Sequence, residues 1–280
     1  MPETDTETDR PEPTNILTGW WDDFRIVLTG WWDDFRIAAS FLTLLPTGKS
    51  AAKGAQEKGA LARAARGFPL AGLAVGLAGA LVYAIADGLN LPPAIASLMA
   101  ISAMISITGA LHEDGLADFA DAVLSAGTKT EKLKIMRDSG IGAYGTLTLV
   151  ITLGLRVAAI AIIAEAGAAA AALIATAVAS RAALPAMMHR MKLARRSGLA
   201  VAAGRPDQNQ AILAAVLGAA VALLFLGPLT GIVALVIGAL GVLKIAYFAQ
   251  RSIGGYTGDV LGAAQQLMET GMLLAIVALG

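Results

Sequence analysis

The chain has 280 residues, of which 56% are hydrophobic and only 15% are charged. A soluble domain usually carries about a quarter of charged residues, so this deficit indicates a surface that faces lipid. Lys and Arg number 21, as do Asp and Glu, so the zero net charge excludes the positive field of a nucleic-acid-binding protein. Because the chain has no cysteine, disulfides, thiol nucleophiles and thiolate metal sites are also excluded.

The N-terminal region divides into an acidic tail and a repeat. Residues 1–14 contain five acids and three prolines, so we expect a disordered tail there. Within 15–45, ILTGWWDDFRI at 16–26 returns as VLTGWWDDFRI at 27–37. Eleven residues make about three helical turns, so both copies present Trp, Phe and Ile on similar sides. This favours an amphipathic helix in the membrane interface, and a local duplication without a role of its own is the alternative.

Residues 46–280 are predicted to form a transmembrane catalytic domain. Most of its apolar segments approach the length of about 20 residues that crosses the hydrocarbon core. We therefore predict an all-α, polytopic membrane helix bundle with about seven transmembrane helices and an N-terminal interfacial helix. The seven segments are 68–86, 94–111, 141–163, 168–188, 211–226, 229–248 and 261–279, with turns expected at Asn90-Leu91-Pro92-Pro93, Ala166-Gly167 and Gly227-Pro228.

Lys and Arg occur in alternate loops of this domain. The loops near 87–93, 164–167 and 227–228 contain neither residue. Under the positive-inside rule, the basic loops lie in the cytoplasm and the C-terminus lies outside. The basic loops are 49–67, 112–140, 189–210 and 249–260.

The densest polar motif is HEDGLADFADAV at 112–123. On a helix, Asp114, Asp118 and Asp121 share one narrow face, where their charges repel unless a cation neutralises them. Oxygen ligands of this kind suit Mg²⁺, which also binds substrate phosphates. A solvated acidic helix end is the alternative. Glu113 points away from that face and is a weaker ligand candidate, while His112 is a candidate general base or a simple hydrogen-bonding residue.

Three further motifs carry candidate substrate contacts. In IMRDSGIGAYG at 135–145, Arg137, Asp138 and Ser139 precede a glycine turn whose free N–H groups suit a phosphate. Arg181 either snorkels or makes a bidentate phosphate contact. Thr257 and Asp259 are candidates for binding a ligand or a second ion.

Inside the apolar segments, Arg156 needs a partner, and Glu269 is one candidate. Together, carboxylates and arginines at one membrane face fit the transfer of a phosphate-linked group.

These motifs resemble the cobalamin synthase family, also called adenosylcobinamide-GDP ribazoletransferase. The resemblance runs from about residue 35 to the C-terminus and rests on five ordered motifs: HEDGLADFADAV, IMRDSGIGAYG, SRAALPAMM, ARRSGLA and GGYTGDVLGA. ASFLTLLP at 39–46 and GFPLAGLAVG at 67–76 also match it.

The resemblance implies a bacterial inner-membrane enzyme that uses Mg²⁺ at an active site facing the cytoplasm. A hydroxyl of α-ribazole or its 5′-phosphate would attack the activated phosphate of adenosylcobinamide-GDP and release GMP. By position, the acidic motif supplies Glu113, Asp114, Asp118 and Asp121 as metal ligands. Gly140 stands where many relatives have Arg, so Arg137 would take over a phosphate contact. The expected partners are the two substrates and the lipid bilayer, without nucleic acid, and the formation of a homo-oligomer is left open.

Two other functions compete with this one. A CDP-alcohol phosphotransferase would use similar metal chemistry, but the Ala-Arg pair expected after Asp114-Gly115 is replaced by Ala117-Asp118. An ion-coupled transporter would also contain intramembrane acids. Transporter sites lie near the bilayer midplane, whereas the acids of this chain are expected at one interface.

Overall fold

The computed structural model describes residues 16–138 and 140–280, and the regular elements in these ranges are helices. This confirms the predicted all-α class, while the predicted tail at 1–14 and Ser139 lie outside the described ranges. The elements are α1 (Ile16–Leu42), α2 (Lys49–Gln56), α3 (Ala60–Arg63), η1 (Ala65–Gly67), α4 (Phe68–Gly88), α5 (Pro93–Thr108), α6 (Leu111–Leu124), α7 (Lys129–Ile135), α8 (Ala143–Ile163), α9 (Ala166–Ala182), α10 (Leu184–Arg190), α11 (Leu199–Ala203), α12 (Gln208–Leu226), α13 (Pro228–Ile253) and α14 (Gly258–Leu279).

The described residues contain six helices that are long and apolar enough to cross a membrane, or seven spans if α5 and α6 count as one. This agrees with the predicted number and makes the chain a multi-pass membrane protein. The two helices of that pair are bent by 89°. Gly109 and Ala110 take φ values of 61° and 57° at the bend, so the helical hydrogen-bond pattern cannot continue through it. The apolar segment predicted at 94–111 therefore ends as a helix at Thr108, and α6 turns away from its axis.

One predicted turn lies two residues earlier than expected. The turn between α8 and α9 falls at Ala164 and Glu165, where Ala164 has a φ of 56°. The side chain of Glu165 accepts hydrogen bonds from the N–H groups of Gly167 and Ala168, so α9 begins before Gly167. Sequence reasoning placed the turn on Ala166-Gly167 because glycine usually marks a turn, whereas here it occupies a helix start.

Small residues allow the helices to pack closely. α4 packs along α9, and α13 packs along α14. A Cβ at position 72 of α4 would lie 2.5 Å from the carbonyl oxygen of Ala177 in α9, so only glycine fits there. Buried alanines such as Ala172 and Ala177 continue this contact, which is the packing expected of membrane helices.

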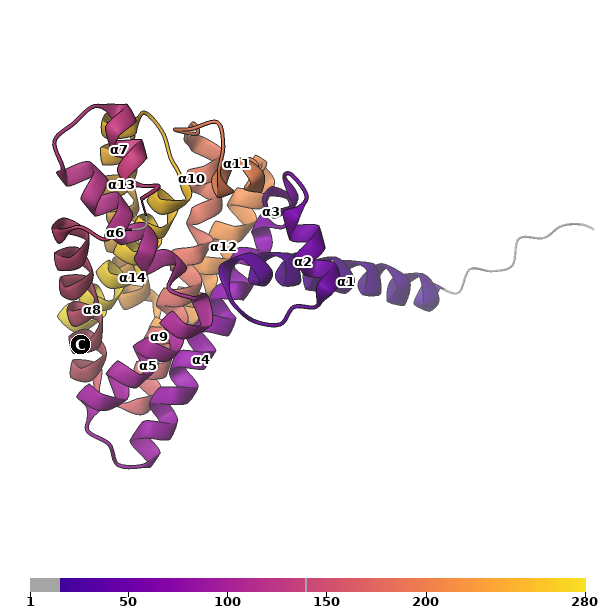
Figure 1. The fold of residues 1–280 in the computed structure, drawn as a ribbon. Coiled ribbons are helices and arrows are strands. Elements are labelled where there is room, and N and C mark those ends of the chain that lie inside the picture. The colour runs from indigo at the N-terminus through magenta and orange to yellow at the C-terminus, as the bar shows by residue number, and fades with distance from the viewer. Residues whose placement is uncertain (1–15, 139) are drawn as a thin grey trace, which may run out of the picture.

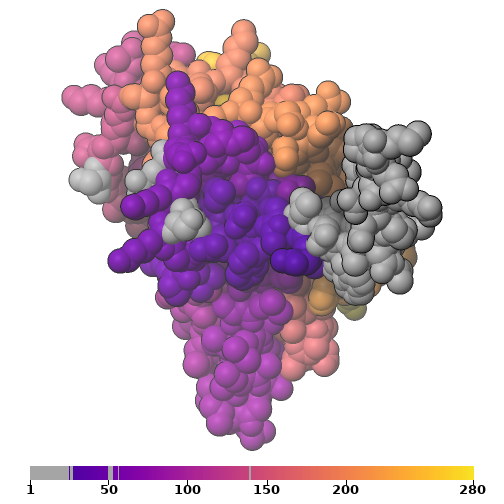
Figure 2. Space-filling model, turned by 90° about the vertical axis from the view of Figure 1, so that its right-hand side faces the viewer, coloured from indigo at the N-terminus to yellow at the C-terminus, as the bar shows by residue number. Residues whose placement is uncertain are grey.

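α1 runs across the bundle, whereas α4 and α9 run along it (Figure 1). In the view turned by 90°, the region of α1 to α3 separates α4 and α5 from the α10–α12 region (Figure 2). Arg66 fixes α1 to the start of α4, because it forms an ion pair with Asp34 and stacks 4.5 Å from the Trp31 ring centre. Trp32 is 59% exposed. The location of α1 in the membrane interface stays a prediction.

Candidate active site

The polar site forms where the first turns of α6 and α14 cross. Gly115 of α6 lies against Gly262 of α14, and neither position has room for a side chain. A Cβ at position 115 would lie 3.0 Å from the carbonyl oxygen of Asp259, and one at position 262 would lie 3.1 Å from that of His112. The two glycines therefore bring Asp259 beside the row of aspartates on α6.

Three carboxylates gather at this crossing, and we call Asp114, Asp118 and Asp259 the acidic cluster. α6, which carries two of them, is not one of the six spanning helices. Burial raises the pKa of Asp118 to about 7, and the negative charges of Asp114 and Asp259 add to the rise. Because like charges oppose ionisation in this way, the acidic cluster favours the binding of a cation.

Arg195 faces the acidic cluster from the loop between α10 and α11. Its Nη2 atom lies 3.7 Å from Oδ2 of Asp259, and the Thr257 hydroxyl donates a hydrogen bond of 2.9 Å to the same oxygen. The N–H of Tyr256 donates to the carbonyl oxygen of Lys192 at 2.8 Å and so holds this loop beside the start of α14. We did not predict a role for Arg195. Its position in the ARRSGLA motif was the available signal.

Asp121, one turn beyond Asp118, holds the start of α8. Its carboxylate oxygens accept hydrogen bonds from the N–H groups of Gly142 at 2.7 Å and Gly145 at 2.9 Å. The Asp121 side chain is buried. These N–H groups belong to the glycine turn for which the sequence suggested a phosphate. Asp121 therefore makes a helix-capping contact, while its negative charge also contributes to the raised pKa of Asp118.

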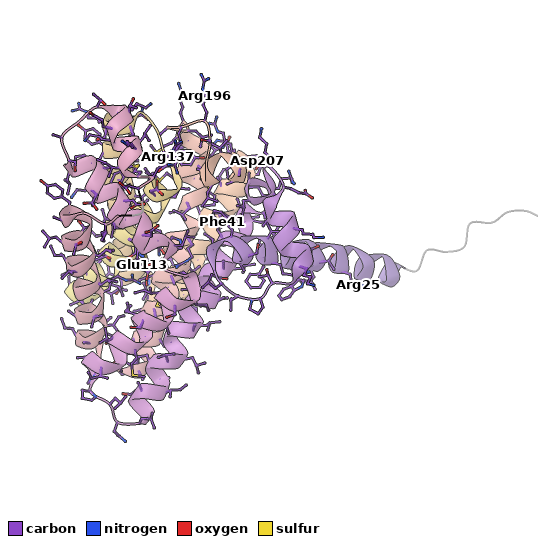
Figure 3. The ribbon with its side chains drawn as sticks, viewed as in Figure 1. Arg25, Phe41, Glu113, Arg137, Arg196 and Asp207 are labelled. Atoms are coloured by element: carbon purple, nitrogen blue, oxygen red, sulfur yellow. The ribbon has the colours of Figure 1, made fainter. Side chains whose placement is uncertain are left out.

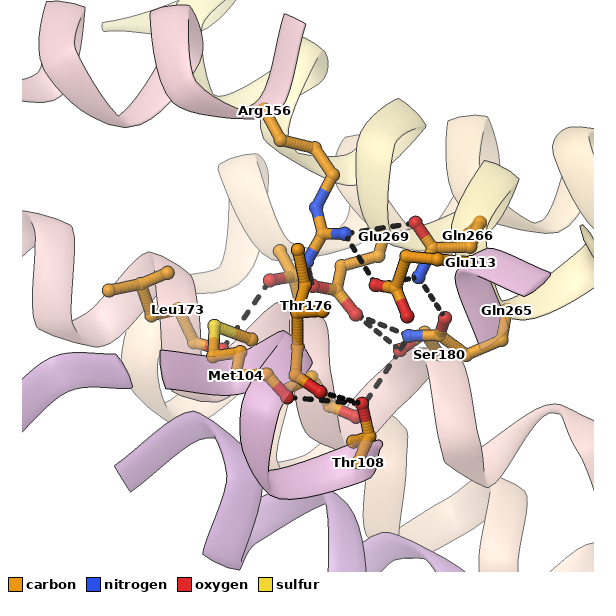
Figure 4. A network of polar contacts seen from close by, with 12 residues as sticks. Met104, Thr108, Glu113, Arg156, Leu173, Thr176, Ser180, Gln265, Gln266 and Glu269 are labelled. Atoms are coloured by element: carbon orange, nitrogen blue, oxygen red, sulfur yellow. Dashed lines mark hydrogen bonds and ion pairs between the residues drawn. The ribbon is translucent and has the colours of Figure 1, made fainter. Parts of the chain in front are cut away.

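A network of buried ion pairs links α6, α8, α9 and α14 (Figure 4). Arg156 donates to Glu113 at 3.3 Å and to Gln266 at 2.9 Å, and it forms an ion pair with Glu269. Arg181 lies 3.4 Å from the other carboxylate oxygen of Glu269. Two arginines and two glutamates thus balance in charge inside the bundle, where an unpaired charge is costly. This confirms Glu269 as the expected partner of Arg156.

Glu113 and Arg181, which the sequence placed in the site, belong to this buried network. Oε1 of Glu113 accepts from both Arg156 and Gln266. Arg181 donates to Glu269 and, at 3.1 Å, to the carbonyl oxygen of Ala177. The structure therefore does not bring either residue into the acidic cluster. Glu113 also points away from the aspartate face, as its position on the predicted helix required.

The remaining residues that were predicted for the site lie beside the acidic cluster or at the same end of the molecule. Arg137 and Asp138 are exposed. Nη2 of Arg137 donates to the Ser197 hydroxyl at 3.3 Å, so it contacts the loop that carries Arg195. Arg137 and Arg196 lie at the end of the molecule opposite the turn between α4 and α5 (Figure 3). His112 is buried and lines a cavity beside the acidic cluster.

The residues of the site fit a divalent cation that is shared with a phosphate. In the described part of the chain, no three His, Asp or Glu side chains converge closely enough to hold a metal by themselves. Mg²⁺ does not need such a cage, because it is usually bound by one or two carboxylates together with waters and substrate phosphates. The acidic cluster offers carboxylates of this kind, and Arg195 and Arg137 add positive charge for phosphate oxygens.

A bundle of apolar helices with carboxylates and arginines gathered at one end defines a multi-pass membrane protein with a polar site for a phosphate-bearing ligand. The chain belongs to the cobalamin-5-phosphate synthase family, whose model matches residues 34–277. This confirms the resemblance drawn from the motifs. The first copy of the Trp-rich repeat, at 16–26, precedes the matched region.

Curated relatives support the same family. An adenosylcobinamide-GDP ribazoletransferase of Bradyrhizobium diazoefficiens is 48% identical over 241 residues, which cover 86% of this chain and 92% of the relative. Relatives with the same name from Azorhizobium caulinodans and Brucella canis are 41% and 42% identical, and they cover 86% and 78% of this chain and 93% and 86% of their own lengths. No solved structure matches the chain.

Proposed function

We propose that this chain joins the cobinamide phosphate of adenosylcobinamide-GDP to α-ribazole, or to α-ribazole 5′-phosphate, and releases GMP. The names of the curated relatives supply the substrates. The observation that carries the proposal is the acidic cluster at the crossing of α6 and α14, with Arg195 paired to Asp259. This combination suits a substrate that carries phosphates and a metal ion.

The proposed reaction is a substitution at the cobinamide-linked phosphorus. A ribose hydroxyl of α-ribazole forms a new P–O bond, the bond from that phosphorus to the GMP oxygen breaks, and a carboxylate of the acidic cluster accepts the hydroxyl proton. When bound, Mg²⁺ neutralises phosphate charge and supports the departure of GMP. One or two carboxylates of the acidic cluster, which comprises Asp114, Asp118 and Asp259, would hold the ion together with phosphate oxygens of the donor.

The arginines would bind the phosphate oxygens of the donor. Arg195 is placed for this because Asp259 and the loop contact at Tyr256 hold it beside the acidic cluster. Arg137 is exposed and contacts the same loop through Ser197. A donor that brings its own negative charge would draw both guanidinium groups toward the acidic cluster.

We place the site on the cytoplasmic side of the inner membrane. Arg137 and Arg196 lie at the same end of the bundle (Figure 3), and the alternate turns, including the one after α4, contain no Lys or Arg. The positive-inside rule therefore assigns the acidic cluster to the cytoplasm.

The direct test uses purified full-length protein with adenosylcobinamide-GDP, α-ribazole and Mg²⁺. We expect equal amounts of GMP and a cobalamin, separated and quantified by chromatography, and no product in the presence of EDTA. A helical, monodisperse preparation that forms neither product would contradict the proposal. Repeating the assay with α-ribazole 5′-phosphate identifies the preferred acceptor from the ratio of kcat/KM values.

A further inference from the structure

An apolar cavity lies directly beside the acidic cluster. It has a volume of about 110 Å³, which is on the scale of the cavities of about 150 Å³ that hold a small aromatic ring. α1 closes one side with Phe41 and Leu42, α11 contributes Ala200 and Ala203, and the start of α14 contributes Gly258. Asp114 and Asp259 also line it, so one end of an apolar ligand would lie beside the acidic cluster.

His112 is the feature of this cavity that points to a ligand. Its side chain is only 2% exposed, and neither Nδ1 nor Nε2 has a hydrogen-bond partner. A buried imidazole without a partner loses the hydrogen bonds that water would provide, which costs about 1–3 kcal/mol. Since His112 lines the cavity, a ligand with a matching polar atom would satisfy it.

We propose that this cavity binds the aromatic base of the acceptor, and that His112 donates a hydrogen bond to its free ring nitrogen. The proposal rests on the proposed function, which makes α-ribazole the acceptor. The benzimidazole of α-ribazole has apolar faces and edges, and one ring nitrogen is left to accept a hydrogen bond. Apart from Asp114 and Asp259 at one end, the cavity offers apolar walls and one donor. His112 is thereby a specificity-determining residue.

The other candidate ligands fit the cavity less well. Guanine has several donors and acceptors on its edges. Asp114 and Asp259 offer acceptors at one end of the cavity, but Phe41, Leu42 and the alanines of α11 would leave the other polar groups of guanine without partners. The corrin ring with its amide side chains is much larger than a cavity of about 110 Å³. With the base in this cavity, the attached ribose would lie toward Asp114 and Asp259, where the new bond forms.

The test measures α-ribazole binding to full-length protein in detergent by equilibrium dialysis, in the absence of the donor. We expect His112→Phe to raise the Kd about tenfold, as the loss of one buried hydrogen bond implies, and His112→Gln to recover part of the affinity. Ala200→Leu, which fills the cavity from α11, should weaken α-ribazole binding without altering His112. The Kd for adenosylcobinamide-GDP should stay unchanged in all three variants.

The chain has one other histidine, which supplies a matched control. Nδ1 of His189 contacts the carbonyl oxygen of Pro206 at 2.9 Å, away from this cavity, so His189→Phe should bind α-ribazole normally. The inference is overturned if His112→Phe and Ala200→Leu both bind α-ribazole like the wild type, or if they weaken donor binding instead. Cobalamin formation with an unchanged α-ribazole KM in His112→Phe would overturn the inference alone. A protein that binds α-ribazole through His112 but forms no product would contradict the proposed function.

Discussion

Replacing Glu269 with Gln should destabilise the bundle more than replacing Glu113, although both glutamates belong to the same buried network. Glu269 is the residue that pairs with both arginines, since its two oxygens face Arg156 and Arg181. Glu113 pairs with Arg156 at 3.3 Å through one oxygen, and its Oε2 atom has no partner. The loss of Glu269 therefore leaves two guanidinium groups to share one carboxylate.

The size of the effect follows from the burial of these groups. Glu269 and Arg156 are each 1% exposed, so water cannot screen the unpaired charge. Breaking a buried ion pair from one side costs about 3–5 kcal/mol. For Glu113→Gln we expect about half of that cost, because Gln266 still donates to the side chain at position 113. At about 2–4 °C per kcal/mol, Glu269→Gln should lower Tm by about 10 °C.

The assay is thermal unfolding of purified protein in detergent, followed by far-ultraviolet circular dichroism. The double variant Arg156→Gln with Glu269→Gln removes one charge of each sign and should regain part of the lost stability, which a double-mutant cycle would measure. The reasoning is refuted if Glu269→Gln melts at the same temperature as Glu113→Gln. It is also refuted if the double variant loses more stability than the two single variants lose in sum.

Three further predictions concern the site, a helix start and the topology. Asp118→Asn should lower turnover by orders of magnitude while the protein still inserts, and full activity at low Mg²⁺ would remove Asp118 from the metal site. Gly145→Ala should cost about 1–3 kcal/mol in a denaturant titration, because its Cβ would lie 2.4 Å from Oδ2 of Asp121. Gly154→Ala on the same helix is the control, since nothing lies within 4 Å of its Cβ. A reporter fused after Gly280 should be periplasmic, and a cytoplasmic signal would mean that the number of crossings is wrong.

The sequence predicts the helices well because membrane spans are set by length and apolar composition alone. The bounds of α4, α8, α12 and α14 match the predicted segments within a few residues. α13 begins almost where predicted but continues to Ile253. The bend after Thr108 was harder to predict, since it depends on Gly109 and Ala110 adopting positive φ. Alanine rarely does so, and a glycine in an apolar segment is also common where membrane helices pack closely, so Gly109 did not stand out as a helix end.

The site was predicted only in part, because its members meet through helix contacts that no local pattern encodes. Helical spacing groups Asp114, Asp118 and Asp121, but it does not show which helix packs against each of them. In the structure, the carboxylate of Asp121 accepts hydrogen bonds at the start of α8, while α14 brings Asp259 beside Asp114 and Asp118. A contact between residues so far apart in the chain is visible only after folding.

Buried charges gave a clearer signal. Arg156 and Glu269 were expected to pair because an ionisable residue inside an apolar span needs a partner. Arg181 obeys the same rule. Its neighbour Ser180 also donates a hydrogen bond to Glu269, so both side chains of α9 contact the same carboxylate on α14. The sequence offered a phosphate contact as the alternative for Arg181, and only the packing of α9 against α14 distinguishes the two roles.

The proposed mechanism requires that carboxylates from α6 and α14 together hold one divalent cation. The most direct measurement is electron paramagnetic resonance of Mn²⁺, used in place of Mg²⁺, with purified protein and adenosylcobinamide-GDP. We expect one bound Mn²⁺ per chain, affinity reduced about tenfold or more in both Asp118→Asn and Asp259→Asn, and no change in Glu113→Gln. Wild-type affinity in both aspartate variants, or loss of Mn²⁺ in Glu113→Gln, would contradict the claim.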